Sequence, residues 1–246
     1  MNRTLTTVTG AGICLLAGQA SAQTYLTDFE SGTDDWTING AATVVDTGGP
    51  NGNALEHYQF EAFWIDIANR KNADYLGDYT AKAPTIEVSV DIKTNYLGSP
   101  YFESPYPREL SLELRDYDNE GAIRGGYPWA SVYSVNETLL TSTERDWVTF
   151  TWTIDTTATE MPSGWGGYGA EDPVTFEPML PSGTSFSDLL SSVDEIIFST
   201  AVPGYFYTYS TFDLQVDNIR FTLVPAPASA GLLGLGGLVA MRRRRA

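Results

Sequence analysis

Three segments of the chain alternate between apolar and polar residues, and this alternation limits the fold more than any other feature of the sequence. They are TIEVSVDIK at 85–93, ELSLELRD at 109–116 and WVTFTWTI at 147–154. The apolar side chains are Ile86, Val88, Val90 and Ile92, then Leu110, Leu112 and Leu114, then Val148, Phe150, Trp152 and Ile154. A period of two residues is that of a strand with one buried face. The sequence therefore predicts half-buried strands.

Further strands are expected along most of the chain. They fall at 25–30, 35–45, 54–67, 129–135, 195–200 and 205–223, separated by turn-rich pieces such as TGGPNGN and PSGWGGYGAEDP. One or two helical turns are expected in SFSDLLSSVDE, where Ser185 or Ser187 can cap. Eight or more short strands in about 200 residues are typical of an all-β, antiparallel β-sandwich or jelly roll. We expect this domain to span residues 23–223.

The first 22 residues have the pattern of an export signal. Arg3 gives a positive start, Val8 to Gly18 is largely apolar, and Ala20 and Ala22 suit signal peptidase. A core strand is the alternative. Cleavage after residue 22 removes the only cysteine, Cys14, and therefore excludes disulfides, cysteine nucleophiles and thiolate metal sites from the mature protein.

The body of the chain is strongly acidic. Without the basic residues near the two ends, 9 basic residues face 31 acidic ones. Such a charge balance repels nucleic acid and anionic membranes, and it favours solubility and divalent cations. A solvated surface alone also accounts for most of it.

The last expected strand changes its inward phase. Leu214 and Val216 share one phase and Ile219 and Phe221 share the other, which predicts a β-bulge between Val216 and Ile219. Asp217 then points toward the core, where a bare carboxylate is costly unless it is paired or binds a metal. Glu30 and carbonyls of the turn GGPNGNALEHY are possible partners, and oxygen ligands suit calcium. The alternative is that Asp217 caps a turn and Glu30 is solvated.

Several pieces of the chain resemble known jelly-roll families. DFESGTDDW, GPNGNAL and QVDNIRF are similar to the first two strands and the last strand of the galactose-binding-like superfamily. ADYLGDYTAKAPTIEVSVDIK, DWVTFTWTID and SFSDLLSSVDEIIFSTAV resemble the laminin type IV domain pattern. The resemblance implies a jelly roll with a structural calcium ion, and it points to Glu30, Asn53 and Asp217 as its ligands.

Catalytic motifs are not evident. DYDNEG starts like an EF-hand loop, but position twelve is Tyr127 instead of glutamate. His57 is the only histidine, and a structural role is the simpler interpretation. The chain has no G-x-S-x-G elbow, Walker loop or H-E-x-x-H. We therefore expect a protein that is not an enzyme.

Aromatic residues in Gly- and Pro-rich loops indicate a different function. Tyr101, Tyr106, Trp129 and Trp165 lie in such loops, and exposed aromatic faces stack on sugar rings. We name these four as candidate ligand-binding residues. The alternative is that they fold back and cover the ends of the sandwich.

Residues 224–246 have the pattern of a sorting segment. The apolar stretch from Ala228 to Met241 spans roughly 21 Å as a helix, short of the roughly 30 Å hydrocarbon layer. Pro225 and Pro227, the glycine-leucine stretch and the four arginines Arg242, Arg243, Arg244 and Arg245 resemble the PEP-CTERM signal, although Ala226 stands where glutamate is usual. The resemblance implies transient inner-membrane insertion, an exosortase-type processing enzyme and a Gram-negative bacterium that exports polysaccharide. An ordinary C-terminal anchor is the alternative.

These observations predict an exported, non-catalytic jelly-roll protein of the cell surface or extracellular matrix that binds glycan and is stabilised by calcium. Two other hypotheses stay open. One is an exported polysaccharide lyase or glycoside hydrolase on the same fold, and the other is a structural matrix protein with no small ligand.

Overall fold

The computed structural model describes residues 21–47, 52–102, 104–118, 128–141 and 146–226, and Ala22–Ala226 form one compact unit. The export signal up to residue 20 and the sorting residues Pro227, Arg242, Arg243, Arg244 and Arg245 lie outside these ranges, whereas Pro225 directly follows the last strand. Within the described ranges, no helix has the length and apolar character needed to cross a membrane.

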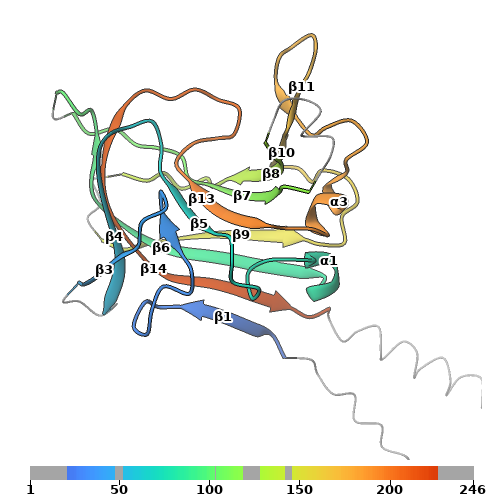
Figure 1. Cartoon of the computed structure of the whole chain (residues 1–246), viewed down its shortest axis with the longest axis horizontal. Coiled ribbons are helices and arrows are strands. Elements are labelled where there is room, and N and C mark those ends of the chain that lie inside the picture. Colours follow the sequence, from blue (N-terminus) through green and yellow to red (C-terminus); the bar gives the residue numbers. More distant parts are fainter. Residues whose placement is uncertain (1–20, 48–51, 103, 119–127, 142–145, 227–246) are drawn as a thin grey trace, which may run out of the picture. The chain divides into compact units, whose positions relative to one another are not determined.

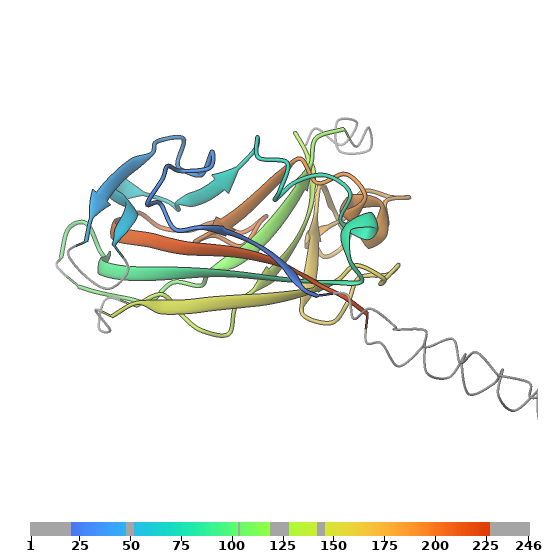
Figure 2. The ribbon, with the colours of Figure 1, turned by 90° about the horizontal axis from the view of Figure 1, so that it is seen from below.

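The body is built from two antiparallel sheets (Figure 1), which confirms the predicted all-β sandwich. The first sheet contains β1 (Gln23–Thr27), β3 (Thr43–Asp46), β4 (Asn53–Ala62), β6 (Thr85–Gly98), β9 (Val148–Asp155) and β14 (Ser210–Val224). Its order is β3-β4-β14-β6-β9, and β1 also pairs with β14. Figure 2 shows its long strands running lengthwise, with strands of the second sheet crossing them at an angle.

The second sheet has the order β10-β8-β7-β13-β5-β2. Its strands are β2 (Thr37–Ile38), β5 (Asp66–Asn69), β7 (Ser111–Asp116), β8 (Ala130–Val135), β10 (Trp165–Tyr168) and β13 (Glu195–Ser199). A hairpin of β11 (Ala170–Glu171) and β12 (Pro178–Met179) and two short helices, α1 (Tyr79–Lys82) and α3 (Phe186–Leu190), complete the described elements. Helix α3 begins at Ser185, whose capping box with Asp188 confirms the predicted helical turn.

The core lies between the sheets and contains the predicted apolar phases. The inward residues of β6, β7 and β9 are at most 5% exposed except Val148, which is half-buried, and Phe212, Leu214 and Val216 of β14 belong to the same core. Burying each such side chain contributes roughly 1.5–3 kcal/mol before the cost of ordering it. The alternation therefore identified the sheet faces that pack together.

Two predicted strands are in fact divided between the sheets. The segment 35–45 forms β2 in one sheet and β3 in the other, because Asn39 and Gly40 take φ of 48° and 79° and turn the chain. The segment 54–67 forms β4 and β5, with Glu61 at φ 59° near the break. Left-handed backbone interrupts a strand, and a polar-apolar pattern does not reveal it at Asn or Glu.

The predicted bulge in the last strand is confirmed. The pairing of β14 with β6 shifts between Asp217 and Arg220, and Asn218 has a left-handed φ of 49°. On the other side of β14, the pairs Val216↔Leu55 and Thr27↔Ile219 place β4 and β1 along the same edge. The bulge therefore lies where β1, β4 and β14 meet.

The two ends of the sandwich are unlike each other. The pair Gln23↔Leu223 places the start of β1 and the finish of β14 at one end. At the other end, the pairs Ser210↔Ala62 and Thr211↔Gly98 bring together the loops that follow β4 and β6 and the loop that precedes β14. These loops lie toward the left in Figure 1.

Candidate functional site

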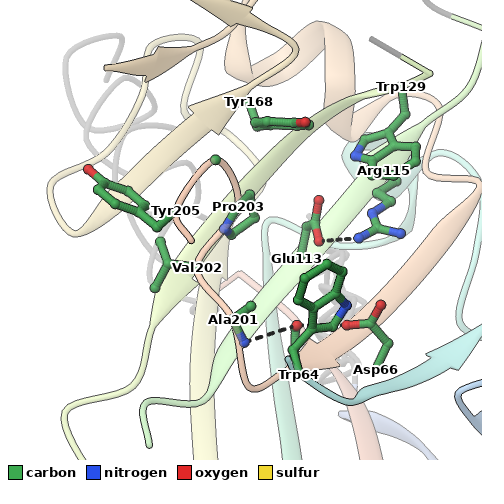
Figure 3. Close-up of a pocket in the computed structure, with 12 residues that line it drawn as sticks. Trp64, Asp66, Glu113, Arg115, Trp129, Tyr168, Ala201, Val202, Pro203 and Tyr205 are labelled. Atoms are coloured by element: carbon green, nitrogen blue, oxygen red, sulfur yellow. Dashed lines mark hydrogen bonds and ion pairs between the residues drawn. The ribbon is translucent and has the colours of Figure 1, made fainter. Parts of the chain in front are cut away.

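A cavity of about 380 Å³ lies on the face of the second sheet that points away from the core. Its floor comes from β5, β7 and β13, and its walls come from the residue before β8, from β10 and from the loop 201–205. The lining residues are Trp64, Asp66, Glu113, Arg115, Trp129, Tyr168, Ser199, Ala201, Val202, Pro203, Gly204 and Tyr205. Figure 3 shows aromatic rings arranged around a carboxylate and a guanidinium group.

Strand β7 supplies the charged centre of this cavity. Leu112 and Leu114 face the core, so Glu113 and Arg115 face outward, yet they are only 1% and 8% exposed. Arg115 Nη2 donates to Glu113 Oε2 at 2.7 Å, and Arg115 Nη1 donates to Glu195 Oε2 at 3.2 Å. Glu195 is the cross-strand neighbour of Arg115 on β13. The register of the sheet thus places one cation between two carboxylates.

Further contacts hold Glu195 in this cluster. Arg70, which is 60% exposed at its side chain, donates Nε to Glu195 Oε1, and Tyr117 Oη donates to Glu195 Oε2 at 2.5 Å. Burial by itself lowers the pKa of Arg115, but Glu113 and Glu195 together raise that pKa above its ordinary value. The guanidinium group therefore stays charged at any physiological pH.

Asp66 is the second acid of the cavity floor. Its Oδ1 accepts a hydrogen bond from Ser199 Oγ at 2.7 Å, across the β5–β13 pair. Burial raises the pKa of Asp66, while the hydrogen bond from Ser199 and the charge of Arg115 act in the opposite direction. Desolvation disfavours the charged form of a carboxyl group, so this side chain holds its proton to a higher pH than a solvated aspartate.

Aromatic rings cover the charged cluster. The Arg115 guanidinium carbon lies 4.1 Å from the Trp129 ring centroid, and the Trp129 ring lies 6.2 Å from that of Tyr168. Trp64 and Tyr205 are exposed at the opposite wall. Trp64 precedes β5, and Tyr205 lies in the loop that follows β13. The cavity therefore presents ring surfaces above and beside hydrogen-bonding groups.

Several buried polar atoms in and beside the cavity have no hydrogen-bond partner within the described part of the chain. They are Glu113 Oε1, Arg115 Nε, Trp129 Nε1 and Ser131 Oγ. An unsatisfied buried polar atom costs about 1–3 kcal/mol, so native proteins leave few of them. Of the seven such atoms found in the described residues, these four belong to residues on or next to β7 and β8. These atoms are themselves enclosed by protein, so they lie beneath the surface that a ligand contacts.

A second cavity of about 450 Å³ adjoins the first and shares Asp66 with it. Its walls are polar and come from β2, β5, β13 and their loops. The lining residues are Thr33, Asp35, Thr37, Asn39, Gly40, Asp66, Ala68, Arg70, Lys71 and Glu195. The charged cluster thus separates an aromatic cavity from a polar one on the same face of the sheet.

Only one of the four predicted ligand-binding aromatics lines the cavity. That residue is Trp129. Trp165 on β10 is half-buried and packs against Phe186, with ring centroids 5.4 Å apart. Tyr101 is exposed in the loop that follows β6. Tyr106 is half-buried, and its hydroxyl donates to the Tyr209 carbonyl at 2.9 Å. Trp165 therefore folds back onto the sandwich, as the alternative interpretation of the loop aromatics predicted.

Sequence reasoning missed most of the cavity. Glu113 and Arg115 occupy the polar phase of β7 and were not singled out, and Asp66, Tyr168 and Tyr205 carry no recognisable motif. One signal was available: two opposite charges stand two residues apart in a strand of otherwise apolar alternation. Such charges on a central strand pair across the sheet instead of with water.

The predicted calcium ligands lie around the bulge of β14. Glu30 Oε1 accepts from the Asn53 backbone N–H at 2.7 Å, and Glu30 Oε2 accepts from Asn53 Nδ2 at 3.3 Å. Asp217 is fully buried, and its carboxylate accepts from the backbone N–H of Asn218 at 2.6 Å. Across the described residues, no three His, Cys, Asp or Glu side chains form a metal-binding group on their own. A cation at this junction would need further oxygen ligands, for which the Asn53 side chain and backbone carbonyls are available.

Comparisons with known proteins show a distant likeness to solved structures. No family model matches the chain, and no curated protein matches it. The N-terminal CBM22-1-GH10 modules of endo-1,4-beta-D-xylanase 10B from Clostridium thermocellum, complexed with xylohexaose, are 14% identical with a TM-score of 0.42, over 77% of this chain and 26% of that chain.

Two further structures have a similar likeness. The family 30 carbohydrate-binding module of a cellulosomal cellulase of Clostridium thermocellum is 15% identical with a TM-score of 0.40, over 77% of this chain and 86% of that chain. An exo-beta-agarase is 11% identical with a TM-score of 0.40, over 85% of this chain and 24% of that chain. The chain thus spans about a quarter of the two enzyme structures and most of the binding module. Values of this size assign the chain to none of these families.

Proposed function

We propose that the protein is an exported, non-catalytic cell-surface or matrix protein that binds a neutral polysaccharide in the cavity of the second sheet. One observation carries the proposal: the rings of Trp64, Trp129, Tyr168 and Tyr205 surround a floor of charged side chains on β5 and β7. Sugar rings offer apolar C–H faces for stacking and hydroxyl groups that both donate and accept. The cavity supplies both kinds of contact.

The charge of the cavity favours a neutral glycan over an acidic one. Its lining holds Asp66 and Glu113 against the single cation Arg115, and Glu195 already shares that cation. The full chain has a net charge of −17. A polyanion approaching this face is repelled at long range, whereas a neutral chain is not.

Affinity gel electrophoresis tests the binding. The gels contain hydroxyethyl cellulose, arabinoxylan or agarose as neutral polymers and alginate as an acidic one. We expect retardation by at least one neutral polymer, and loss of that retardation in Trp64→Ala, because Trp64 is an exposed wall residue. Phe176→Ala is the matched control, since Phe176 is 73% exposed and lines neither cavity. Normal migration in all four polymers contradicts the proposal.

The competing hypothesis of a lyase or hydrolase has its own test. The purified protein is incubated with the same polymers, and the products are assayed for new reducing ends and for unsaturated uronic acids. We expect neither product. Their appearance at a rate that Glu113→Gln abolishes overturns the non-catalytic part of the proposal and leaves the cavity as an active site.

We also propose that calcium stabilises the junction of β1, β4 and β14. The oxygen groups of Glu30, Asn53 and Asp217 support this, because calcium prefers carboxylate and carbonyl oxygen. We expect millimolar CaCl₂ to raise the melting temperature measured by calorimetry, and Glu30→Gln to lose most of that increase. A melting temperature that neither CaCl₂ nor a chelator moves counts against the site.

Export and sorting by the two ends of the chain complete the proposal. Mass spectrometry of the protein recovered from the cell surface or medium is expected to show a mature N-terminus at Gln23 and a C-terminus that precedes Arg242. Recovery of the intact chain from the cytoplasm contradicts this part.

A further inference from the structure

Exposed aromatic side chains gather at the end of the sandwich where the loops after β4 and β6 and the loop before β14 meet. Together with the half-buried Phe63, they form what we call the aromatic band: Phe60, Phe63, Trp64, Tyr101, Phe102, Tyr205, Phe206 and Tyr209. Phe102 and Phe206 are the most exposed, at 81% and 85%. Single exposed aromatics are common on proteins, but a contiguous group of them marks an interaction surface.

Seven of the eight rings contact one another in two groups, and Tyr205 directly precedes Phe206 in the chain. Phe63 lies 6.1 Å from Trp64, 5.5 Å from Phe206 and 4.1 Å from Tyr209, between ring centroids. Tyr101 lies 6.3 Å from Phe60 and 6.4 Å from Phe102. The pairs Ser210↔Ala62 and Thr211↔Gly98 place the loops that carry these two groups at the same end of the first sheet. The band therefore crosses the end of the sandwich from one sheet to the other.

The band is continuous with the candidate glycan cavity. Trp64 and Tyr205 belong to both, because each lines the cavity and is also exposed at the loop end. A chain that leaves the cavity past these two residues meets Phe63 and Phe206 next. Proteins often enlarge a binding surface in this way, with ordered side chains beyond a deep pocket.

Polar groups within the band identify the occupant. Tyr101 donates its hydroxyl to the carboxylate of Glu61, an exposed residue. A lipid layer or an apolar protein surface would remove water from this carboxylate at a large cost. Sugar hydroxyls, in contrast, donate hydrogen bonds to it.

We propose that the aromatic band extends the glycan site, so that the protein contacts a neutral polysaccharide over a length greater than the cavity accommodates. This inference rests on the proposed function, since it takes the cavity to hold part of the same chain. It requires polymers to bind more tightly than short oligosaccharides, through residues outside the cavity.

The test compares each neutral polymer with its own short oligosaccharide: hydroxyethyl cellulose with cellotriose, arabinoxylan with xylotriose, and agarose with agarotetraose. The variant Phe102→Ser/Phe206→Ser changes two residues of high exposure that line neither cavity. We expect it to lose about tenfold in polymer affinity, equivalent to about 1.4 kcal/mol, while its affinity for the oligosaccharide stays within about twofold. Val174→Ser is the matched control, because Val174 is 81% exposed and outside the band.

Each other outcome has a definite meaning. If the double variant binds the polymer as tightly as the wild type, the proposed role of the band is overturned, whereas the proposed glycan site in the cavity is unaffected. If the wild-type chain binds neither the polymer nor the oligosaccharide, the proposed function fails as well. Two further controls test other occupants of the band. If the wild-type chain binds zwitterionic phosphatidylcholine vesicles and the double variant does not, the band binds lipid and the proposal is overturned. If the wild-type chain forms a dimer in sedimentation and the double variant does not, the band binds a second copy and the proposal is likewise overturned.

Discussion

Arg115 is the residue on which the most contacts of the candidate site depend. It is 8% exposed, bonds two carboxylates that are themselves 1% exposed, and lies against the Trp129 ring. Removing one partner of a buried ion pair leaves a charge without compensation, which is far more costly than removing a solvated one. We therefore regard Arg115 as the structural support of the cavity floor.

Replacing Arg115 with alanine is expected to lower the free energy of unfolding by about 3–5 kcal/mol, because Glu113 is left buried without a cation and Glu195 keeps only the exposed Arg70. Arg70→Ala is the matched control. Arg70 pairs with the same Glu195 but its side chain is 60% exposed, so its loss is expected to cost at most about 1 kcal/mol. Urea denaturation measures both. Similar small losses for the two variants would show that the cluster is not held by Arg115.

Tyr117 gives the cluster a dependence on alkaline pH. Burial and the hydrogen bond to Glu195 raise the pKa of Tyr117 to about 12, whereas tyrosine in an unfolded chain has a pKa of about 10. Between these values the unfolded chain loses a proton that the folded chain keeps, so the free energy of unfolding falls as pH rises. Urea denaturation from pH 9 to 12 is expected to show a less steep fall in Tyr117→Phe than in the wild type. Equal slopes contradict this account.

The sequence predicted the site residues less well than it predicted the core. Alternation marks which side of a strand is apolar, so Leu112 and Leu114 were placed correctly. It does not show that loops cover the polar side, and therefore it did not reveal that Glu113 and Arg115 are buried. Trp129 could be chosen because it lies in a Gly- and Pro-rich loop, but the same criterion also chose Trp165, which packs against Phe186.

At the scale of elements, the junction of β1, β4 and β14 depends on backbone that takes left-handed φ values. Phe29 and Asn218 have φ of 58° and 49°, and Gly52 has φ of 66°. A Cβ atom on Gly52 would lie 1.8 Å from Glu30 Oε1, so the carboxylate occupies the space that a side chain would need. Glycine is therefore required at position 52 for two reasons: its φ is left-handed, and the Glu30 carboxylate approaches its Cα closely.

Gly52→Ala is expected to destabilise the protein by about 2–3 kcal/mol, since it adds left-handed strain of about 1 kcal/mol and displaces the Glu30 carboxylate from Asn53. Gly40→Ala provides the comparison. Gly40 has φ of 79° with nothing within 4 Å of an added Cβ, so only the strain of about 1 kcal/mol applies. Thermal unfolding followed by circular dichroism separates them. Equal losses would mean that the contact between Glu30 and Asn53 contributes nothing.

The sequence predicted those elements whose position depends on side-chain patterns. It missed the strand breaks that depend on the backbone angles of single residues. The strands β6, β9 and β14, the bulge of β14 and the turn that begins at Ser185 all follow from side-chain patterns, and the structure has them. The break near Asn39 depends on left-handed Asn39 and Gly40, and the break near Glu61 depends on a left-handed residue that is not glycine. The energetic penalty for such residues is offset by the packing of two separate sheets, which no local pattern encodes.

At the scale of the whole molecule, net charge separates the proposed ligand from acidic alternatives. Binding of a neutral polysaccharide to a chain of net charge −17 is expected to change by less than about twofold between 20 mM and 500 mM NaCl, because no counterions are released. Isothermal titration calorimetry with the polymer that binds provides the measurement. A strong rise of affinity with salt would instead indicate an acidic polymer whose repulsion is screened.

The pairing of the first strand with the last has a mechanical consequence. Gln23 lies opposite Leu223, and the pairing continues inward to Thr27 and Ile219. Because the strands are antiparallel, tension applied to these two ends pulls β1 away from β14 one residue pair at a time, beginning at the first pair. Resistance to such peeling comes from single backbone hydrogen bonds in succession, in contrast to the simultaneous rupture that shearing requires. Under load, β1 is therefore the first element to detach, while β14 keeps its pairing with β6.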